Sequence, residues 1–67
     1  MNTYIEKILE KMYEIVKKHK QVTIATFAAE LGFSPRTISE YMDMLPIKYK
    51  DVQIVYINRK KYAVYMK

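Results

Sequence analysis

A single glycine, Gly32, lies between two stretches of the chain in which apolar residues repeat at helical spacing. Glycine most readily ends a helix in a left-handed conformation. Thr23 is placed to cap the helix before Gly32. Ser34 can cap a second helix with its hydroxyl, and Pro35 suits the first position inside that helix. The sequence therefore predicts two short helices joined by a tight turn, over residues 24–31 and 35–45.

Two helices joined in this way form a helix-turn-helix, whose second helix can lie in a DNA major groove. The stretch resembles the helix-turn-helix of winged-helix transcriptional regulators. The residues that carry the resemblance are Ala28-Ala29-Glu30-Leu31-Gly32, Ser34-Pro35-Arg36-Thr37-Ile38, Tyr41-Met42 and Leu45. The resemblance implies an α+β fold, a winged helix-turn-helix with three helices and a small antiparallel β-sheet that carries a hairpin wing.

The N-terminal segment fits the same order of elements. Residues 4–18 predict a helix, because apolar residues recur at positions i, i+3, i+4 and i+7. Residues 21–23 contain a β-branched pair, and the winged-helix resemblance implies that they form the small first strand. The apolar side of the first helix is wide. Tyr4, Ile5 and Ile8 near its start lead to the hypothesis that two chains pair there as a homodimer.

The C-terminal segment predicts a hairpin. Pro46 is expected to end the second helix of the motif, since the residue before a proline avoids the helical conformation. Residues 52–57 and 62–66 are rich in β-branched and aromatic residues, as strands are. Asn58 tolerates the left-handed conformation of a tight turn, so residues 58–61 are predicted to form the tip of the wing.

The charge balance favours a polyanionic partner. The 67 residues, which we expect to form a single domain over 1–67, contain 12 Lys and Arg against 7 Asp and Glu, a net charge of +5. Double-stranded DNA is the first candidate, and an anionic membrane surface is the second. The alternative interpretation is a soluble protein that is merely basic.

Other classes of function find little support in the composition. There is no cysteine and only one histidine, His19, which we place in an exposed basic helix end. A His/Cys zinc site and a Ser/His/Asp triad are therefore out of reach, and we expect neither an enzyme nor a cofactor. No apolar run approaches the length of a membrane span, and the N-terminus lacks the pattern of a secretory signal. We expect a cytoplasmic protein with no small-molecule ligand.

The second helix of the motif supplies candidate base contacts. Arg36 lies in its first turn and can bond guanine in two places. Ser34, Thr37 and Ser39 can bond phosphates or bases, and the resemblance implies that these four positions touch DNA. Glu40 can accept from a cytosine amine or hold Arg36 in place. Ser34 also has a capping role, and the Arg36–Glu40 pair is equally consistent with a surface salt bridge.

The same helix carries a feature that opposes DNA binding. Its exposed side is predicted to hold Arg36, Glu40 and Asp43, a net charge of −1, and the two carboxylates repel phosphates. The wing is expected to supply the missing affinity through basic residues in the turn and before the hairpin, namely Arg59, Lys60, Lys61, Lys48 and Lys50. The alternative is a solvated turn whose lysines protect a strand edge.

We therefore expect a sequence-specific double-stranded DNA-binding protein, a transcriptional regulator of a prokaryote, an archaeon or one of their mobile elements. Two alternatives stay open: a winged-helix protein-interaction module, which the acidic recognition helix suits, and a non-specific architectural DNA binder. Most tyrosines on or near the strands are interpreted as packing residues rather than as platforms for nucleobases.

Overall fold

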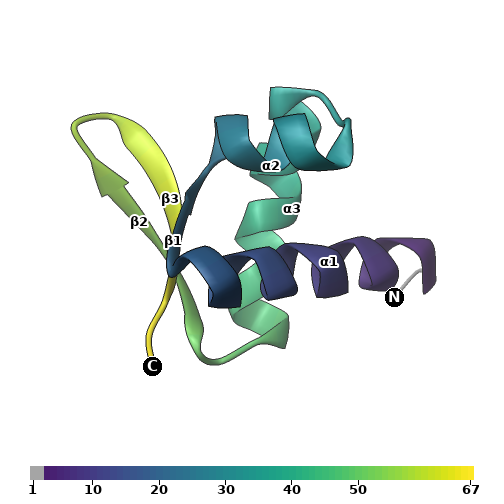
Figure 1. Ribbon diagram of the computed structural model, residues 1–67, viewed down its shortest axis with the longest axis horizontal. Coiled ribbons are helices and arrows are strands. Elements are labelled where there is room, and N and C mark those ends of the chain that lie inside the picture. The colour runs from purple at the N-terminus through teal and green to yellow at the C-terminus, as the bar shows by residue number, and fades with distance from the viewer. Residues whose placement is uncertain (1–2) are drawn as a thin grey trace.

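The computed structural model describes residues 3–67. These residues form three helices and a three-stranded antiparallel sheet in the strand order β1-β3-β2 (Figure 1). The elements follow one another as α1 (Thr3–His19), β1 (Gln21–Thr23), α2 (Ile24–Leu31), α3 (Pro35–Lys48), β2 (Val52–Ile57) and β3 (Lys60–Tyr65). This order confirms the predicted winged helix-turn-helix.

The turn between α2 and α3 is built as its residues predict. Thr23 caps α2 by accepting a hydrogen bond from the Thr26 amide, and Gly32 ends the helix at φ 77°, in the left-handed region. Ser34 caps α3 and Pro35 follows it as the first helical residue. Because each of these residues acts within three or four positions of itself, local chemistry is enough to specify the turn.

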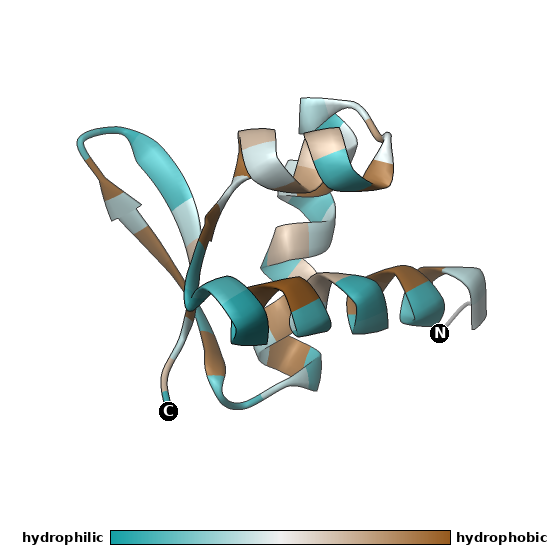
Figure 2. Cartoon of the chain, viewed as in Figure 1, coloured by the Kyte–Doolittle hydropathy of each residue, from teal (hydrophilic) through white to brown (hydrophobic). Residues whose placement is uncertain are grey.

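The core lies where the helices meet one face of the sheet. Figure 2 shows hydrophobic and hydrophilic residues alternating along α1, as expected of a helix with one buried side. The core residues buried most completely include Leu9, Met12, Val16, Phe27, Ile38, Met42, Leu45 and Ala63. The predicted apolar sides of the first and third helices are therefore the surfaces that pack against each other and the sheet.

The same packing bears on the dimer hypothesis. Ile8 is buried in the core of its own chain, and Ile5 packs against that core. Tyr4 is largely exposed. The part of α1 that was expected to pair two chains is therefore mostly occupied within one chain.

The prediction that Pro46 ends the third helix is wrong. α3 continues through Pro46 to Lys48, and the Tyr49 amide still donates to the Leu45 carbonyl at 2.7 Å. A proline inside a helix removes one backbone hydrogen bond, here the one that Met42 would accept. Burial of Leu45 and the stacking of Tyr49 on α1 hold the last turn in place. Tertiary packing thus outweighs the local preference.

The hairpin is tighter than predicted. Asn58 and Arg59 alone form its turn, both with positive φ (50° and 69°), the conformation of a two-residue type I′ turn. Lys60 and Lys61 already belong to β3, opposite Ile57 and Tyr56. Because side chains alternate across a strand, Lys60 is exposed and Lys61 is buried.

Candidate nucleic-acid interface

The solvent-facing side of α3 is a stripe of four residues, Arg36, Glu40, Asp43 and Ile47, spaced so that they lie above one another. The Arg36 side chain is 92% exposed, and its Nε is 4.0 Å from Glu40 Oε2. An ion pair this long and this exposed contributes little stability. Arg36 is therefore available to contact a ligand, because breaking its ion pair with Glu40 costs little free energy.

The start of α3 presents hydroxyls beside backbone amides. Ser34 Oγ accepts from the Thr37 amide at 3.3 Å and donates to Thr37 Oγ1 at 3.0 Å. Ser34 is exposed and Thr37 is half-buried. The capping role of Ser34 is confirmed, and the helix start also has the amide groups that bind a phosphate.

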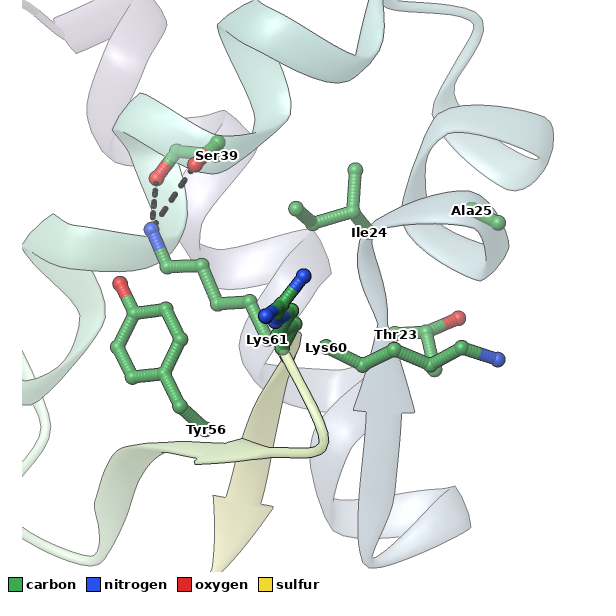
Figure 3. A pocket seen from close by; sticks show the side chains of 8 residues that line it. Thr23, Ile24, Ala25, Ser39, Tyr56, Lys60 and Lys61 are labelled. Atoms are coloured by element: carbon green, nitrogen blue, oxygen red, sulfur yellow. Dashed lines mark hydrogen bonds between the residues drawn. The ribbon is translucent and has the colours of Figure 1, made fainter.

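Lys61 is the candidate residue whose observed position differs most from the predicted one. It is only 8% exposed, and its Nζ donates to the backbone carbonyl and to Oγ of Ser39, each at 2.9 Å. The same Nζ lies 2.7 Å from Asp43 Oδ1. Figure 3 shows the Lys61 side chain reaching from the wing to Ser39 on α3. Lys61 and Ser39, predicted to contact DNA, instead contact each other and join the wing to the helix.

A groove of about 490 Å³ lies between the wing, the start of α2 and the middle of α3. Figure 3 shows Thr23 and Ala25 on one side of it and Tyr56 beside Lys61. Exposed Arg59 and Lys60 also line the groove. Neither makes an ion pair within residues 3–67, so their charges remain available to an anion.

Tyr56 is a site residue that the sequence reasoning missed. It was interpreted as a packing residue, yet its exposed fraction is 68% and it lines the groove. No sequence signal marked it, because Tyr56 has the same parity as Val52, which is buried at the start of β2. Burial does not alternate along the whole strand, and both Tyr56 and Ile57 are exposed at its end.

Lys48 and Lys50 lie at the opposite end of the hairpin from the turn. Lys48 is the last residue of α3, and its Nζ lies 4.0 Å from Oε2 of Glu6 on α1. Lys50 follows before β2 begins. β2 then spans six residues, or roughly 17 Å, before the turn. Figure 1 shows the connection from α3 to β2 at the end of the hairpin away from its turn, so the structure does not bring these two lysines to the wing tip.

At the base of the hairpin, three aromatic residues, Tyr13, Tyr49 and Tyr65, form a cluster beside Asp51. The rings of Tyr13 and Tyr49 stack with centroids 3.9 Å apart, and Tyr65 meets Tyr13 edge-on at 6.3 Å. The Tyr13 hydroxyl donates to Asp51 Oδ2 at 2.6 Å, and this bond, with desolvation, raises the pKa of Tyr13 to about 12. The interpretation of tyrosines on or near the strands as packing residues is confirmed for Tyr49 and Tyr65.

Residues 3–67 contain no cluster of metal-ligating side chains, because no three of their His, Asp or Glu groups come close enough together to hold an ion. None of the helices in this range is both long enough and apolar enough to cross a membrane. Exposed charges lie on the α3 stripe and the wing, and also on α1, where Lys7, Lys11 and Lys18 are exposed.

The described residues form three helices, of which the third has one exposed side, and a three-stranded antiparallel sheet that ends in a hairpin wing. This arrangement defines a winged helix-turn-helix protein. Among solved structures, the chain is similar to F-112, a DNA-binding winged-helix protein from Sulfolobus Spindle-shaped Virus 1. The two share 25% sequence identity over 100% of this chain and 99% of that chain, with a TM-score of 0.73. No family model and no curated protein sequence matches the chain.

Proposed function

We propose that this chain binds double-stranded DNA, with the first half of α3 in the major groove and the wing turn against the phosphate backbone. The observation that carries the proposal is the pair of exposed cations Arg59 and Lys60, which flank the groove beside α3 without an ion pair in the described chain. Similarity over the whole chain to F-112, a DNA-binding winged-helix protein, supports the same assignment.

The affinity in this proposal comes from the wing. Each phosphate that Arg59 or Lys60 neutralises releases condensed counterions, so binding weakens steeply as salt rises. Amide groups at the start of α3 add a further phosphate site next to Ser34. Such contacts position the protein on the duplex without reading its sequence.

The sequence preference in this proposal comes from Arg36. Its side chain is nearly fully exposed in the first turn of α3, where a helix in the major groove meets base edges. A bidentate contact with guanine discriminates against other bases by about 1–3 kcal/mol. Thr37 and Glu40 lie close enough on the same helix to contribute, whereas Ser39 acts through Lys61.

We also propose that the chain acts as a transcriptional regulator in the cytoplasm. A small winged helix with an exposed recognition helix and a basic wing suits operator binding, and a homodimer would double the contacts with DNA. Since Ile5 and Ile8 pack within the chain, pairing would have to use other surfaces. Sedimentation at high micromolar concentration tests this part, and a monomer there would contradict it.

Fluorescence anisotropy of labelled random-sequence duplex DNA, at low and near-physiological salt, tests the proposed function. We expect binding that weakens steeply with salt, followed by recovery of a preferred site when the protein selects from a random pool. Absence of binding at low salt would contradict the proposal and leave a protein-interaction module. Binding without any selected site, unchanged by Arg36→Ala, would indicate an architectural DNA binder.

A further inference from the structure

Lys61 is the one buried charged residue among residues 3–67. An ammonium group has three protons to donate, and the structure provides three acceptors: the Ser39 carbonyl, Ser39 Oγ and Asp43 Oδ1. Burying a charge is costly, and a linear apolar side chain would fill the same space without that cost. A lysine at this position is therefore better explained by its charge than by its contribution to stability.

We propose that Lys61 is a positioning residue for DNA binding, which orients the wing against α3 and neutralises Asp43 where that carboxylate would face the phosphates. The proposal rests on the proposed function. It concerns a residue that itself does not touch DNA, because its ammonium group is enclosed by α3 and the wing.

The electrostatic part follows from the exposed stripe of α3. Arg36, Glu40 and Asp43 together carry a net charge of −1, and Asp43 is 64% exposed, so an unpaired carboxylate there would repel the DNA backbone. Adding the charge of Lys61 brings the four residues to zero. At 2.7 Å the ion pair is short enough to mask Asp43 at the distances of a phosphate contact.

The geometric part follows from the place of Lys61 in the sheet. β3 is the central strand, and Lys61 comes two residues after the turn residue Arg59. Both hydrogen bonds of its ammonium group end on Ser39, one turn beyond Arg36 on α3. Because Lys61 is held in place, the wing tip and α3 stay at a fixed separation. Less conformational entropy is then lost when the wing tip and α3 contact the same duplex.

Four proteins test the proposal: the wild type, Lys61→Met, Asp43→Asn and the double variant, each measured by anisotropy with the same duplex across a salt series. We expect Lys61→Met to weaken binding about tenfold, because it exposes the charge of Asp43 and frees the wing. Asp43→Asn should strengthen binding a few-fold. The double variant should recover the part of the loss that comes from the exposed carboxylate and keep the part that comes from the freed wing.

Matched controls make the same changes of charge on α1. Lys11→Met and Glu10→Gln alter exposed residues beside Tyr13 and Tyr49, at the base of the hairpin rather than at its tip. Each should change the affinity less than its counterpart. Circular dichroism melts show whether Lys61→Met is folded. If it is not, Asp43→Asn, at an exposed carboxylate, still tests the electrostatic part in a folded protein.

The outcomes separate the alternatives. A wild type that does not bind DNA overturns the proposed function and this role together. If the wild type binds but Asp43→Asn fails to strengthen binding or to rescue Lys61→Met, the masking of Asp43 is wrong and only the assignment of Lys61 fails. If Lys61→Met makes the salt dependence shallower by about 0.9, Lys61 itself contacts a phosphate, which contradicts the proposal.

Discussion

The two ends of the β2–β3 hairpin differ in whether their polar and charged side chains have partners within the chain. At the base, polar and aromatic groups are paired with one another: the Tyr13 hydroxyl bonds Asp51, and its ring stacks on Tyr49. At the tip, Arg59 and Lys60 are exposed and make no ion pair within the described chain. One short hairpin thus has a base where the Asp51 carboxylate is hydrogen-bonded within the chain and a tip where the charges of Arg59 and Lys60 face solution.

This difference separates stability from binding. Contacts that are completed within the chain contribute to the free energy of folding, whereas exposed charges of one sign contribute little to it and attract an oppositely charged partner. We therefore expect substitutions at the base to change mainly the free energy of unfolding, and substitutions at the tip to change mainly DNA affinity.

The largest effect is expected at the base. Tyr49→Ala removes the ring that stacks on Tyr13 and helps to hold the last turn of α3. The free energy of unfolding should fall by about 2 kcal/mol, or roughly 10 °C in Tm for a domain of this size. Thermal melts followed by circular dichroism measure the change. The folded fraction should keep its DNA affinity, and a specific loss of affinity would contradict the separation.

The next effect is expected at the tip. Replacing Arg59 and Lys60 together with alanine should weaken DNA binding tenfold or more at near-physiological salt, because two phosphate contacts are lost. The dependence of log K on log salt should become shallower by roughly 1.8, at about 0.9 for each contact. Anisotropy titrations measure both. The Tm should stay close to that of the wild type, and a marked fall would show that the turn is structural.

A smaller effect is expected for Tyr13→Phe, which keeps the stack and removes only the hydroxyl. The Tm should fall by a few degrees at neutral pH, less than for Tyr49→Ala, with DNA affinity unchanged. The pH dependence gives a sharper test. The hydrogen bond to Asp51 raises the pKa of Tyr13 from 10.0 to about 12.

A folded-state pKa above the unfolded value means that the neutral hydroxyl is stabilised by folding. This contribution is fully present below pH 10.0 and is lost as pH rises through about 12. The stability difference between wild type and Tyr13→Phe should therefore shrink over that range. Ultraviolet titration of the wild type should show a tyrosine that ionises near pH 12, and this component should be absent from Tyr13→Phe. Tyr49, whose pKa burial also raises, should still ionise late in both proteins, so only persistence of the component near pH 12 would contradict the assignment.

The smallest effect is expected from the lysines at the base. Replacing Lys48 and Lys50 with alanine removes the same charge as the double substitution at the tip. Since these residues lie further than a Debye length from the turn, DNA affinity at near-physiological salt should change less than about twofold. Parallel anisotropy titrations of the two double variants make the comparison. Equal losses would mean that net charge, rather than its position, governs binding.

Sequence reasoning succeeded where the cause of a structure is local. Thr23, Gly32 and Ser34 act on amides and carbonyls a few positions away, so the helix-turn-helix could be predicted in detail. It failed at Pro46 because contacts distant in sequence hold the last turn of α3. It also grouped Lys48 and Lys50, which precede the hairpin, with the turn residues as DNA contacts, since no local pattern showed how far β2 would carry the chain from them.

Lys61 shows the same limit at the site itself. Its partner Ser39 is 22 positions away, and no spacing rule connects a strand residue with a helix residue at that distance. One signal was present: Lys61 and Ala63 have the same parity, so a strand starting at Lys60 puts both on one face. With the strand predicted from residue 62, Lys61 was assigned to the turn and to DNA.

Amide chemical-shift mapping by NMR, with a random-sequence duplex titrated into the full chain, tests most directly where DNA binds. The shifts should concentrate on residues 34–40 and on Asn58, Arg59 and Lys60, with little change at Lys50 and Asp51. That pattern would establish the first half of α3 and the wing tip as one DNA-binding surface. Shifts centred on the base of the hairpin, or none at low salt, would contradict it.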